Sequence, residues 1–207
     1  MLKIQHELIS YSKEGQDRMV RRLVRTPGFF LDIGSGPPQK TNNTYMLERI
    51  GWSGIMMDQK IEMIEEAKLC RKATAFCMDC AQGRNEWLHF LRDNNVPSVI
   101  DYMSVDIDQW NIQFIQNFPF DLYEFKVMTY ETDCYKGDMA IKNAALNILG
   151  NYPQYRMLLD DARLLDNRIW EDWWVNEKYV KCKRIYTKGA QWKEFINKLE
   201  HEPVLYL

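Results

Sequence analysis

Acidic side chains follow five short apolar runs of this sequence, each close to the point where the run ends. They are Asp32, Asp58, Asp79, the pair Asp106 and Asp108, and the pair Glu131 and Asp133. An acid in such a place can cap the next helix, accept hydrogen bonds from the hydroxyl or amino groups of a ligand, or take up a proton. Capping alone would rarely place an acid at all five ends. We therefore interpret several of them as ligand-binding or catalytic residues.

Two glycines stand in the first of these places, in the stretch GFFLDIGSGPPQK at residues 28–40. Gly34 and Gly36 have no Cβ, so the backbone there can approach a ligand closely. A dinucleotide-binding loop would need a third small residue where this chain has Gln39, and it would need the N–H groups that Pro37-Pro38 lacks. We predict that the prolines begin a helix and that the loop binds a nucleoside without a pyrophosphate, such as S-adenosylmethionine (SAM).

The next two acids complete a nucleoside-binding order. Asp58 at the end of the second apolar run is placed to accept hydrogen bonds from both hydroxyls of a ribose. Asp79 after the third run can accept a hydrogen bond from the amino group of an adenine. Together with Asp32, Gly34 and Gly36, these two acids are the predicted cofactor-binding residues.

Strand-like and helix-like segments alternate along the first 150 residues, and these segments must position the acids. The predicted strands span residues 29–33, 54–58, 73–79, 99–108 and 123–133, each followed by a helical segment. Short, nearly continuous apolar strands that alternate with helices are typical of a parallel sheet covered on both faces. Ligands of such sheets bind at the carboxyl ends of the strands, which is where the acids stand.

The pattern changes after Gly150. Residues 155–167 and 171–176 could form two last strands, both candidates for antiparallel strands at the sheet edge. The apolar spacing in 190–200 predicts a closing amphipathic helix. The predicted fold is therefore α/β: an open, mainly parallel Rossmann-like sheet of about seven strands with helices on both faces, the last strand antiparallel. We expect a single domain over residues 1–207. Its parts are a helical extension (1–27), a cofactor-binding core (28–135), and the remaining sheet edge with the closing helix (136–207).

Composition narrows the class of protein. The chain has 207 residues, 46% of them hydrophobic, and a net charge of −2. A nearly neutral chain is a poor polyanion binder, so we expect a small-molecule or carbohydrate partner and not a nucleic acid. No apolar run is long enough to span a membrane, and five cysteines, an odd number, favour reduced thiols and a cytoplasmic setting.

Five motifs in order resemble the FkbM-like SAM-dependent methyltransferases. They are SKEGQD (12–17), GFFLDIGSG (28–36), NNTYMLERIGWSGIMMD (42–58), IDYMSVDID (100–108) and MTYETD (128–133). The resemblance covers roughly residues 10–135. It implies a class I methyltransferase fold and transfer of a methyl group from SAM, commonly to a hydroxyl oxygen of a sugar or another small molecule.

Asp106 and Asp108 are the predicted catalytic residues, because the end of the fourth strand should face the transferred methyl group. A minority alternative is a divalent cation such as Mg²⁺ among Asp106, Asp108, Glu131 and Asp133, since hard cations favour clustered carboxylates. Two other classes stay open. An NAD(P)-dependent oxidoreductase would share the sheet and Asp58, and a catalytically silent binding protein would share everything except turnover.

Overall fold

The computed structural model describes residues 9–24, 27–164, 166–181, 187–201 and 205–206. Its helices are α1 (Gln16–Leu23), α2 (Tyr45–Arg49), α3 (Ile61–Cys70), α4 (Arg84–Asp93), α5 (Asn111–Asn117), α6 (Ala140–Leu149) and α7 (Trp192–His201), with 3-10 turns η1 (Asp108–Trp110) and η2 (Cys134–Lys136). Its strands are β1 (Phe29–Ile33), β2 (Ser53–Asp58), β3 (Thr74–Cys77), β4 (Val99–Val105), β5 (Glu124–Glu131), β6 (Tyr155–Arg163), β7 (Ile169–Asn176), β8 (Val180–Lys181), β9 (Thr187–Lys188) and β10 (Leu205–Tyr206).

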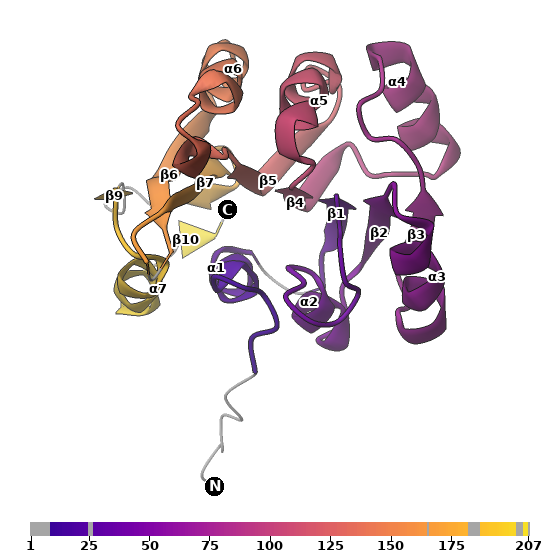
Figure 1. Cartoon of the computed structure of the whole chain (residues 1–207), viewed down its shortest axis with the longest axis horizontal. Coiled ribbons are helices and arrows are strands. Elements are labelled where there is room, and N and C mark those ends of the chain that lie inside the picture. Colours follow the sequence, from indigo (N-terminus) through magenta and orange to yellow (C-terminus); the bar gives the residue numbers. More distant parts are fainter. Residues whose placement is uncertain (1–8, 25–26, 165, 182–186, 202–204, 207) are drawn as a thin grey trace, which may run out of the picture.

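Eight of these strands form one open sheet in the order β3-β2-β1-β4-β5-β7-β6-β9 (Figure 1). β3, β2, β1, β4 and β5 are parallel, and β7 is antiparallel to both of its neighbours, β5 and β6. The strand order reverses between β1 and β4, so the connections that leave these two strands diverge. A crevice is expected at this point of an α/β sheet.

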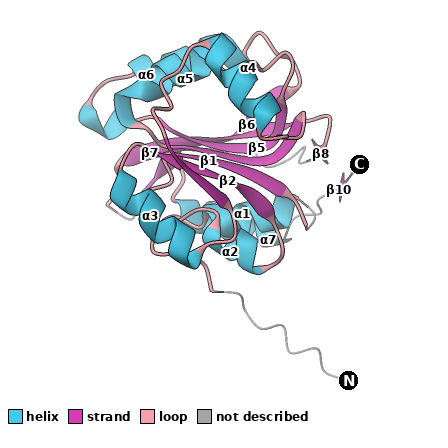
Figure 2. Cartoon of the chain, turned by 90° about the vertical axis from the view of Figure 1, so that its right-hand side faces the viewer, coloured by secondary structure: helices cyan, strands magenta, loops and turns pink. Residues whose placement is uncertain are grey.

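Helices cover both faces of the sheet (Figure 2). α4, α5 and α6 lie on one face, and α1, α2, α3 and α7 lie on the other. Each face has its own apolar core, because the side chains of a strand alternate between the two faces. Phe30 of β1 belongs to the core under α1 and α7, whereas its neighbours Leu31 and Ile33 belong to the core under α4 and α5.

The predicted fold class is confirmed: the sheet is open, mainly parallel and covered on both faces. The antiparallel strand is the last long one, as expected, but it does not lie at the edge. β7 is inserted between β5 and β6, with Thr129 of β5 opposite Trp173. β6 therefore runs in the same direction as β5, although both residue runs 155–167 and 171–176 were candidates for antiparallel strands.

The helix after the glycine loop begins later than predicted. Pro37 and Pro38 lie in a bend, and α2 begins only at Tyr45. The helix start is set by Asn42, whose side-chain oxygen accepts hydrogen bonds from the backbone N–H groups of Thr44 and Tyr45 at 3.0 and 2.9 Å. The prolines thus extend the loop and do not open a helix.

The predicted closing helix is present as α7. Its residues Phe195, Ile196 and Leu199 are buried and belong to the core that also contains Met19 and Val20 of α1. Residues 1–8 and 25–26 of the expected N-terminal extension lie outside the described residues. Within the described part of the chain, no helix is both long and apolar enough to cross a membrane.

Candidate functional site

The turn after β1 brings the backbones of β1 and β4 into contact. Gly34 has a φ of +79°, and a Cβ on it would lie 1.8 Å from the carbonyl oxygen of Asp106. Gly36 has a φ of +57°, and nothing lies within 4 Å of where its Cβ would be. Both conformations favour glycine. Gly34 is therefore required by the close approach of β4, while Gly36 leaves open space above the loop for a ligand.

Asp32 stabilises the loop that follows β1 through buried hydrogen bonds. Its carboxylate is 2% exposed and accepts hydrogen bonds from the hydroxyl of Thr44 at 2.8 Å and the side-chain amide of Asn42 at 3.3 Å. Burial raises the pKa of Asp32 to about 6, against the lowering effect of Thr44 and the nearby Arg71. Asp32 thus fixes the segment that follows Gly36, and its role in cofactor binding stays a prediction.

Sequence reasoning missed Arg71, the main support of this loop. Its buried guanidinium donates to the carbonyl oxygen of Pro38 at 2.7 Å, to Asn42 at 3.1 Å and to Thr44 at 3.0 Å, and it lies 3.2 Å from a carboxylate oxygen of Glu48. Arg71 follows α3 and stands at no strand end, so no local pattern marked it. Only the packing of α3 beside the loop reveals its role.

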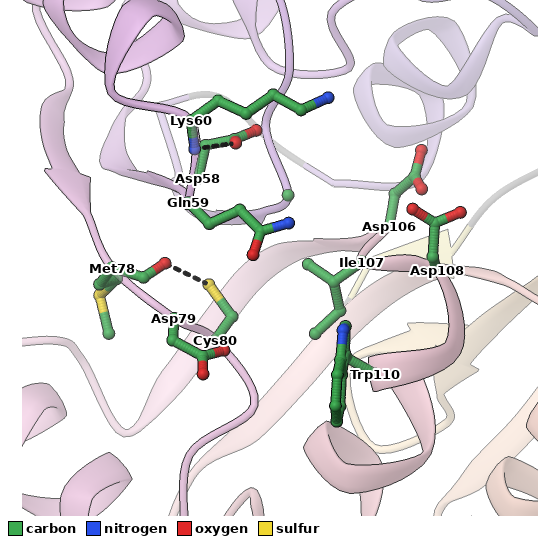
Figure 3. Close-up of a pocket in the computed structure, with 11 residues that line it drawn as sticks. Asp58, Gln59, Lys60, Met78, Asp79, Cys80, Asp106, Ile107, Asp108 and Trp110 are labelled. Carbon is green, nitrogen blue, oxygen red and sulfur yellow. Dashed lines mark hydrogen bonds between the residues drawn. The ribbon is translucent and has the colours of Figure 1, made fainter.

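A pocket opens between the ends of β1, β2, β3 and β4 (Figure 3). It is lined by Gly34, Asp58, Gln59, Lys60, Met78, Asp79, Cys80, Asp106, Ile107, Asp108 and Trp110. Carboxylates from three strand ends therefore meet in one place, as the strand-end pattern predicted. Met78, Ile107 and Trp110 add apolar walls, and Trp110 is 47% exposed. The pocket offers a flat apolar surface beside acids, which suits the base and ribose of a nucleoside.

Asp58 faces this pocket and also closes the loop above it. Its two oxygens accept hydrogen bonds from the backbone N–H groups of Gly36 at 2.9 Å and Lys60 at 2.8 Å. Each carboxylate oxygen has a second lone pair that can accept a ribose hydroxyl. Asp79 is exposed at the rim, where one of its oxygens accepts from the N–H of Ala81 at 2.8 Å.

A second pocket lies on the other side of Gly34 and Asp106, which line both. It is lined by Lys13, Gln16, Asp32, Gly34, Ser35, Gly36, Pro37, Thr41, Asn43, Ser104, Asp106, Trp170 and Glu171. The two pockets are therefore two ends of one crevice at the switch point of the sheet. Asp32, Gly34, Gly36 and Asp106 are brought together here, whereas Asp58 and Asp79 line only the first pocket.

The segment before α1 supplies a wall of the second pocket, which the sequence analysis did not foresee. Asp17 is fully buried and accepts hydrogen bonds from the hydroxyls of Ser10 and Ser12 at 2.6 and 2.8 Å, which pins this segment. It carries Lys13, whose ammonium group lies 3.7 Å from the centre of the Trp170 ring. Both Lys13 and Gln16 belong to the SKEGQD motif, which was noted only as part of a resemblance.

Glu171 of β7 lies beside this segment in the wall of the second pocket. It is 4% exposed and accepts hydrogen bonds from the side chains of Gln16 and Trp173, both at 2.6 Å. Burial raises the pKa of Glu171 to about 8, against the lowering effect of these two donors. The strand run 171–176 was predicted, but a buried acid facing the crevice from it was not.

The acids at the ends of β4 and β5 form one cluster. Asp106 is open to both pockets, yet protein atoms surround it, so desolvation raises its pKa while a hydrogen bond with Glu131 lowers it. Glu131 is 4% exposed, and burial and the adjacent Asp106 both raise its pKa. Glu131 is therefore the partner that keeps the proton, and Asp106 is the carboxylate that faces the crevice.

The fourth strand was predicted to reach Asp108, but Asp108 lies outside β4. β4 ends at Val105, and Asp108 begins the 3-10 turn η1 with a φ of +52°. Its carboxylate lies 3.3 Å from the ammonium group of Lys136, which is also 2.7 Å from Asp133. Asp108 still lines the first pocket beside Asp106 (Figure 3).

Comparison with known proteins identifies the fold. No protein-family model matches the sequence, and no curated protein matches it. A candidate rRNA methylase of Clostridium thermocellum aligns with a TM-score of 0.53 at 13% identity, over 82% of this chain and 99% of that one. A candidate methyltransferase of Streptococcus mutans, solved in complex with SAH, gives a TM-score of 0.54 at 12% identity, over 81% and 99%. Spermidine synthase of Thermotoga maritima gives 0.54 at 13% identity, over 93% and 72%.

The strand order and these neighbours define the class I SAM-dependent methyltransferase fold. This confirms the fold that the sequence motifs implied. The likeness extends to the architecture alone, because the identities are between 12 and 13%. The resemblance to FkbM-like enzymes has no matching family model and stays a prediction.

Proposed function

We propose that this protein is a SAM-dependent methyltransferase that methylates a hydroxyl oxygen of a sugar or another small molecule, as the FkbM-like motifs imply. The observation that carries the proposal is the position of Asp58. Its carboxylate lies at the end of β2 in a pocket with Gly34, Asp79 and the exposed ring of Trp110. Asp58 can accept hydrogen bonds from the ribose hydroxyls, Asp79 can accept one from the adenine amino group, and the Trp110 ring offers an apolar wall. These are the contacts that the adenosine part of SAM needs.

The second pocket suits the methyl acceptor. It adjoins the first through Gly34 and Asp106, so a ligand that fills the adenosine pocket extends toward it. SAM would supply an electrophilic methyl group at this junction. The neighbour from Streptococcus mutans contains SAH, the demethylated product of such a cofactor, within the same fold.

Asp106 is the group that would take the proton of the acceptor hydroxyl. It faces both pockets, and Glu131 behind it can hold a second proton without leaving the carboxylate pair doubly charged. Asp108 is the second catalytic candidate, because it stands beside Asp106 at the mouth of the first pocket. In-line placement and a base are the main requirements of transfer to oxygen. The proposed acceptor is a small molecule or carbohydrate in the cytoplasm, and not a nucleic acid.

Calorimetry with SAM, SAH and NAD tests the cofactor. We expect SAM and SAH to bind and NAD to bind at least about tenfold more weakly, since the loop lacks the donors that a pyrophosphate needs. Asp58→Ala should weaken SAH binding at least about tenfold, because charge-assisted hydrogen bonds to the ribose are lost. Asp93→Ala, an exposed acid on α4, is the control. Tighter binding of NAD, or an unchanged affinity in Asp58→Ala, would contradict the proposal.

Release of SAH from SAM in the presence of a panel of sugars tests the chemistry. Asp106→Asn keeps the shape of the side chain but removes its basicity, so turnover should fall about 10²–10⁴-fold. SAH affinity should stay close to that of the natural chain. If Asp106→Asn turns over at the full rate, Asp106 is not the base. If SAM binds and no hydroxyl compound is methylated, the catalytically silent binding protein becomes the better interpretation.

A further inference from the structure

Three carboxylates from two neighbouring strand ends meet beside the crevice. They belong to Asp108 in η1, to Glu131 at the end of β5, and to Asp133 two residues later. One oxygen from each lies within 4.8 Å of the other two. Asp106 is not in this group and faces the pockets instead.

Two oxygens of this group have no hydrogen-bond partner in the part of the chain that the structure describes. They are Glu131 Oε2 and Asp133 Oδ1, buried atoms of residues that are 4% and 5% exposed. A buried acceptor that is left unpaired has lost its hydrogen bonds to water without replacement, which destabilises the folded chain, and more so when the acceptor is charged. Native structures rarely tolerate such atoms without a ligand, an ion or a shared proton. These two atoms therefore point to something that the protein alone does not supply.

The cation already present satisfies the group only in part. Lys136 Nζ lies 2.7 Å from Asp133 Oδ2 and 3.3 Å from Asp108 Oδ1. Among the described residues, no ion pair joins Lys136 to Glu131, and Asp133 Oδ1 is not the oxygen that Lys136 contacts. The Lys136 side chain is 47% exposed, so it can turn into solvent without crossing the protein.

We propose that Asp108, Glu131 and Asp133 bind one divalent cation of the oxygen-preferring class, and that Lys136 occupies its place in the metal-free protein. A carboxylate ligand must be deprotonated, so cation binding releases the proton that Glu131 keeps beside Asp106 in the metal-free protein. Oxygens on opposite sides of Ca²⁺ are about 4.6–5.2 Å apart, and on opposite sides of Mg²⁺ about 4.0–4.2 Å. Three oxygens that lie within 4.8 Å of one another can therefore reach one ion of this class together.

Such a site adds a function to the crevice that the SAM proposal does not require. The cation would lie beside Asp106, at the end of β4 where an acceptor would be held. A divalent ion there can bind an acceptor hydroxyl and lower the pKa of its proton. Cation binding is measured without SAM and without turnover, so the two proposals fail separately.

Calorimetry of the whole metal-free chain with MnCl₂, CaCl₂ and MgCl₂ tests the site, and Mn²⁺ is also followed by electron paramagnetic resonance. We expect one ion per chain with a dissociation constant of about 10⁻⁵–10⁻³ M. Glu131→Gln and Asp133→Asn should each weaken Mn²⁺ binding at least about tenfold, because each removes a charged ligand. Asp161→Asn, in an acidic group that a buried lysine already satisfies, is the matched control.

Lys136→Met tests the site without removing any of the three proposed metal ligands. If Lys136 competes with the metal, its removal should tighten Mn²⁺ binding several-fold, roughly the effect of deleting one weak, half-exposed ion pair. Circular dichroism and the urea midpoint of each variant establish that it is folded. The proposal is overturned if no ion binds below about 10⁻² M. It is also overturned if ions bind equally well to the natural chain, Asp133→Asn and Lys136→Met, which would indicate non-specific binding to surface acids.

Discussion

The molecule contains two groups of three carboxylates that differ in how their charge is balanced. In one group, Lys142 Nζ lies 2.5, 2.6 and 2.9 Å from Asp160, Asp161 and Asp172, and its side chain is 6% exposed. In the other, Lys136 reaches Asp108 and Asp133, and its side chain is 47% exposed. The first lysine is fixed inside the protein by α6 and β6, and the second lies at the surface on η2.

This difference separates a structural role from a binding role. Lys142 contacts all three acids of its group, so a metal ion would have to displace a buried cation from three ion pairs. Burial lowers the pKa of Lys142, but its acidic partners, Asp172 first, raise it by more, so it stays charged. Among the described residues, Asp172 Oδ2 in this buried group also has no hydrogen-bond partner, so one unpaired oxygen alone does not mark a binding site. The buried group keeps a buried lysine in contact with all three acids even if the exposed Lys188, 3.7 Å from Asp160, moves away. The crevice group has only the half-exposed Lys136 among its ion pairs in the described residues.

Replacing the buried lysine should give the largest loss of stability. Lys142→Met removes the buried cation from Asp160, Asp161 and Asp172 and leaves only the exposed Lys188, 3.7 Å from Asp160. Breaking a buried pair in this way costs about 3–5 kcal/mol. Urea denaturation at pH 7.5 measures the free energy of unfolding. The loss should shrink as the pH falls and the acids become protonated. A loss below about 1 kcal/mol would mean that the buried group is no more structural than the one at the surface.

Glu171 extends the comparison to a buried acid with neutral donors only. Its pKa is about 8 in the folded chain against 4.5 for an ordinary glutamate, so between those values the folded state binds more protons than the unfolded state. Stability from this residue is therefore present at low pH and lost as the pH rises through about 8.

Glu171→Gln should remove that part of the pH dependence, about 2–4 kcal/mol between pH 5 and pH 8. The glutamine oxygen can still accept from Gln16 and Trp173, so packing is retained. Urea denaturation over this pH range compares the variant with the natural chain, and Glu62→Gln on the exposed face of α3 is the control. If the slope with pH is the same in all three, Glu171 does not titrate as its burial indicates.

Replacing the surface lysine should give the smallest effect on stability. Lys136→Met removes two half-exposed ion pairs, and pairs of this kind contribute little because water and salt screen them, so the urea midpoint should hardly move. Urea denaturation of this variant beside Lys142→Met is the sharpest form of the comparison. Equal losses in the two variants would show that Lys136 is also a structural cation, and the crevice group would then have no exchangeable place.

The sequence by itself determined how strands and helices alternate along the first 150 residues. It also determined which acids stand at the ends of the strands. Both are local properties: apolar periodicity reports which face of a segment is buried, and the chain direction puts every parallel strand end at one edge. Asp58, Asp79 and Asp106 could therefore be assigned to one pocket before any contact was known. The same local reasoning gave the closing helix.

Only the tertiary structure decided which distant residues complete the site. Gln16 and Glu171 are 155 positions apart, yet they share a hydrogen bond in the wall of the second pocket. That contact depends on the insertion of β7 beside β5 and on the packing of α1 against one face of the sheet. No local sequence pattern specifies either feature. The roles of Arg71, Lys136 and Lys142 follow the same rule. The sequence alone does not show whether a charged side chain is exposed to solvent or paired inside the protein. That depends on its burial and on the nearest opposite charge, and the fold decides both.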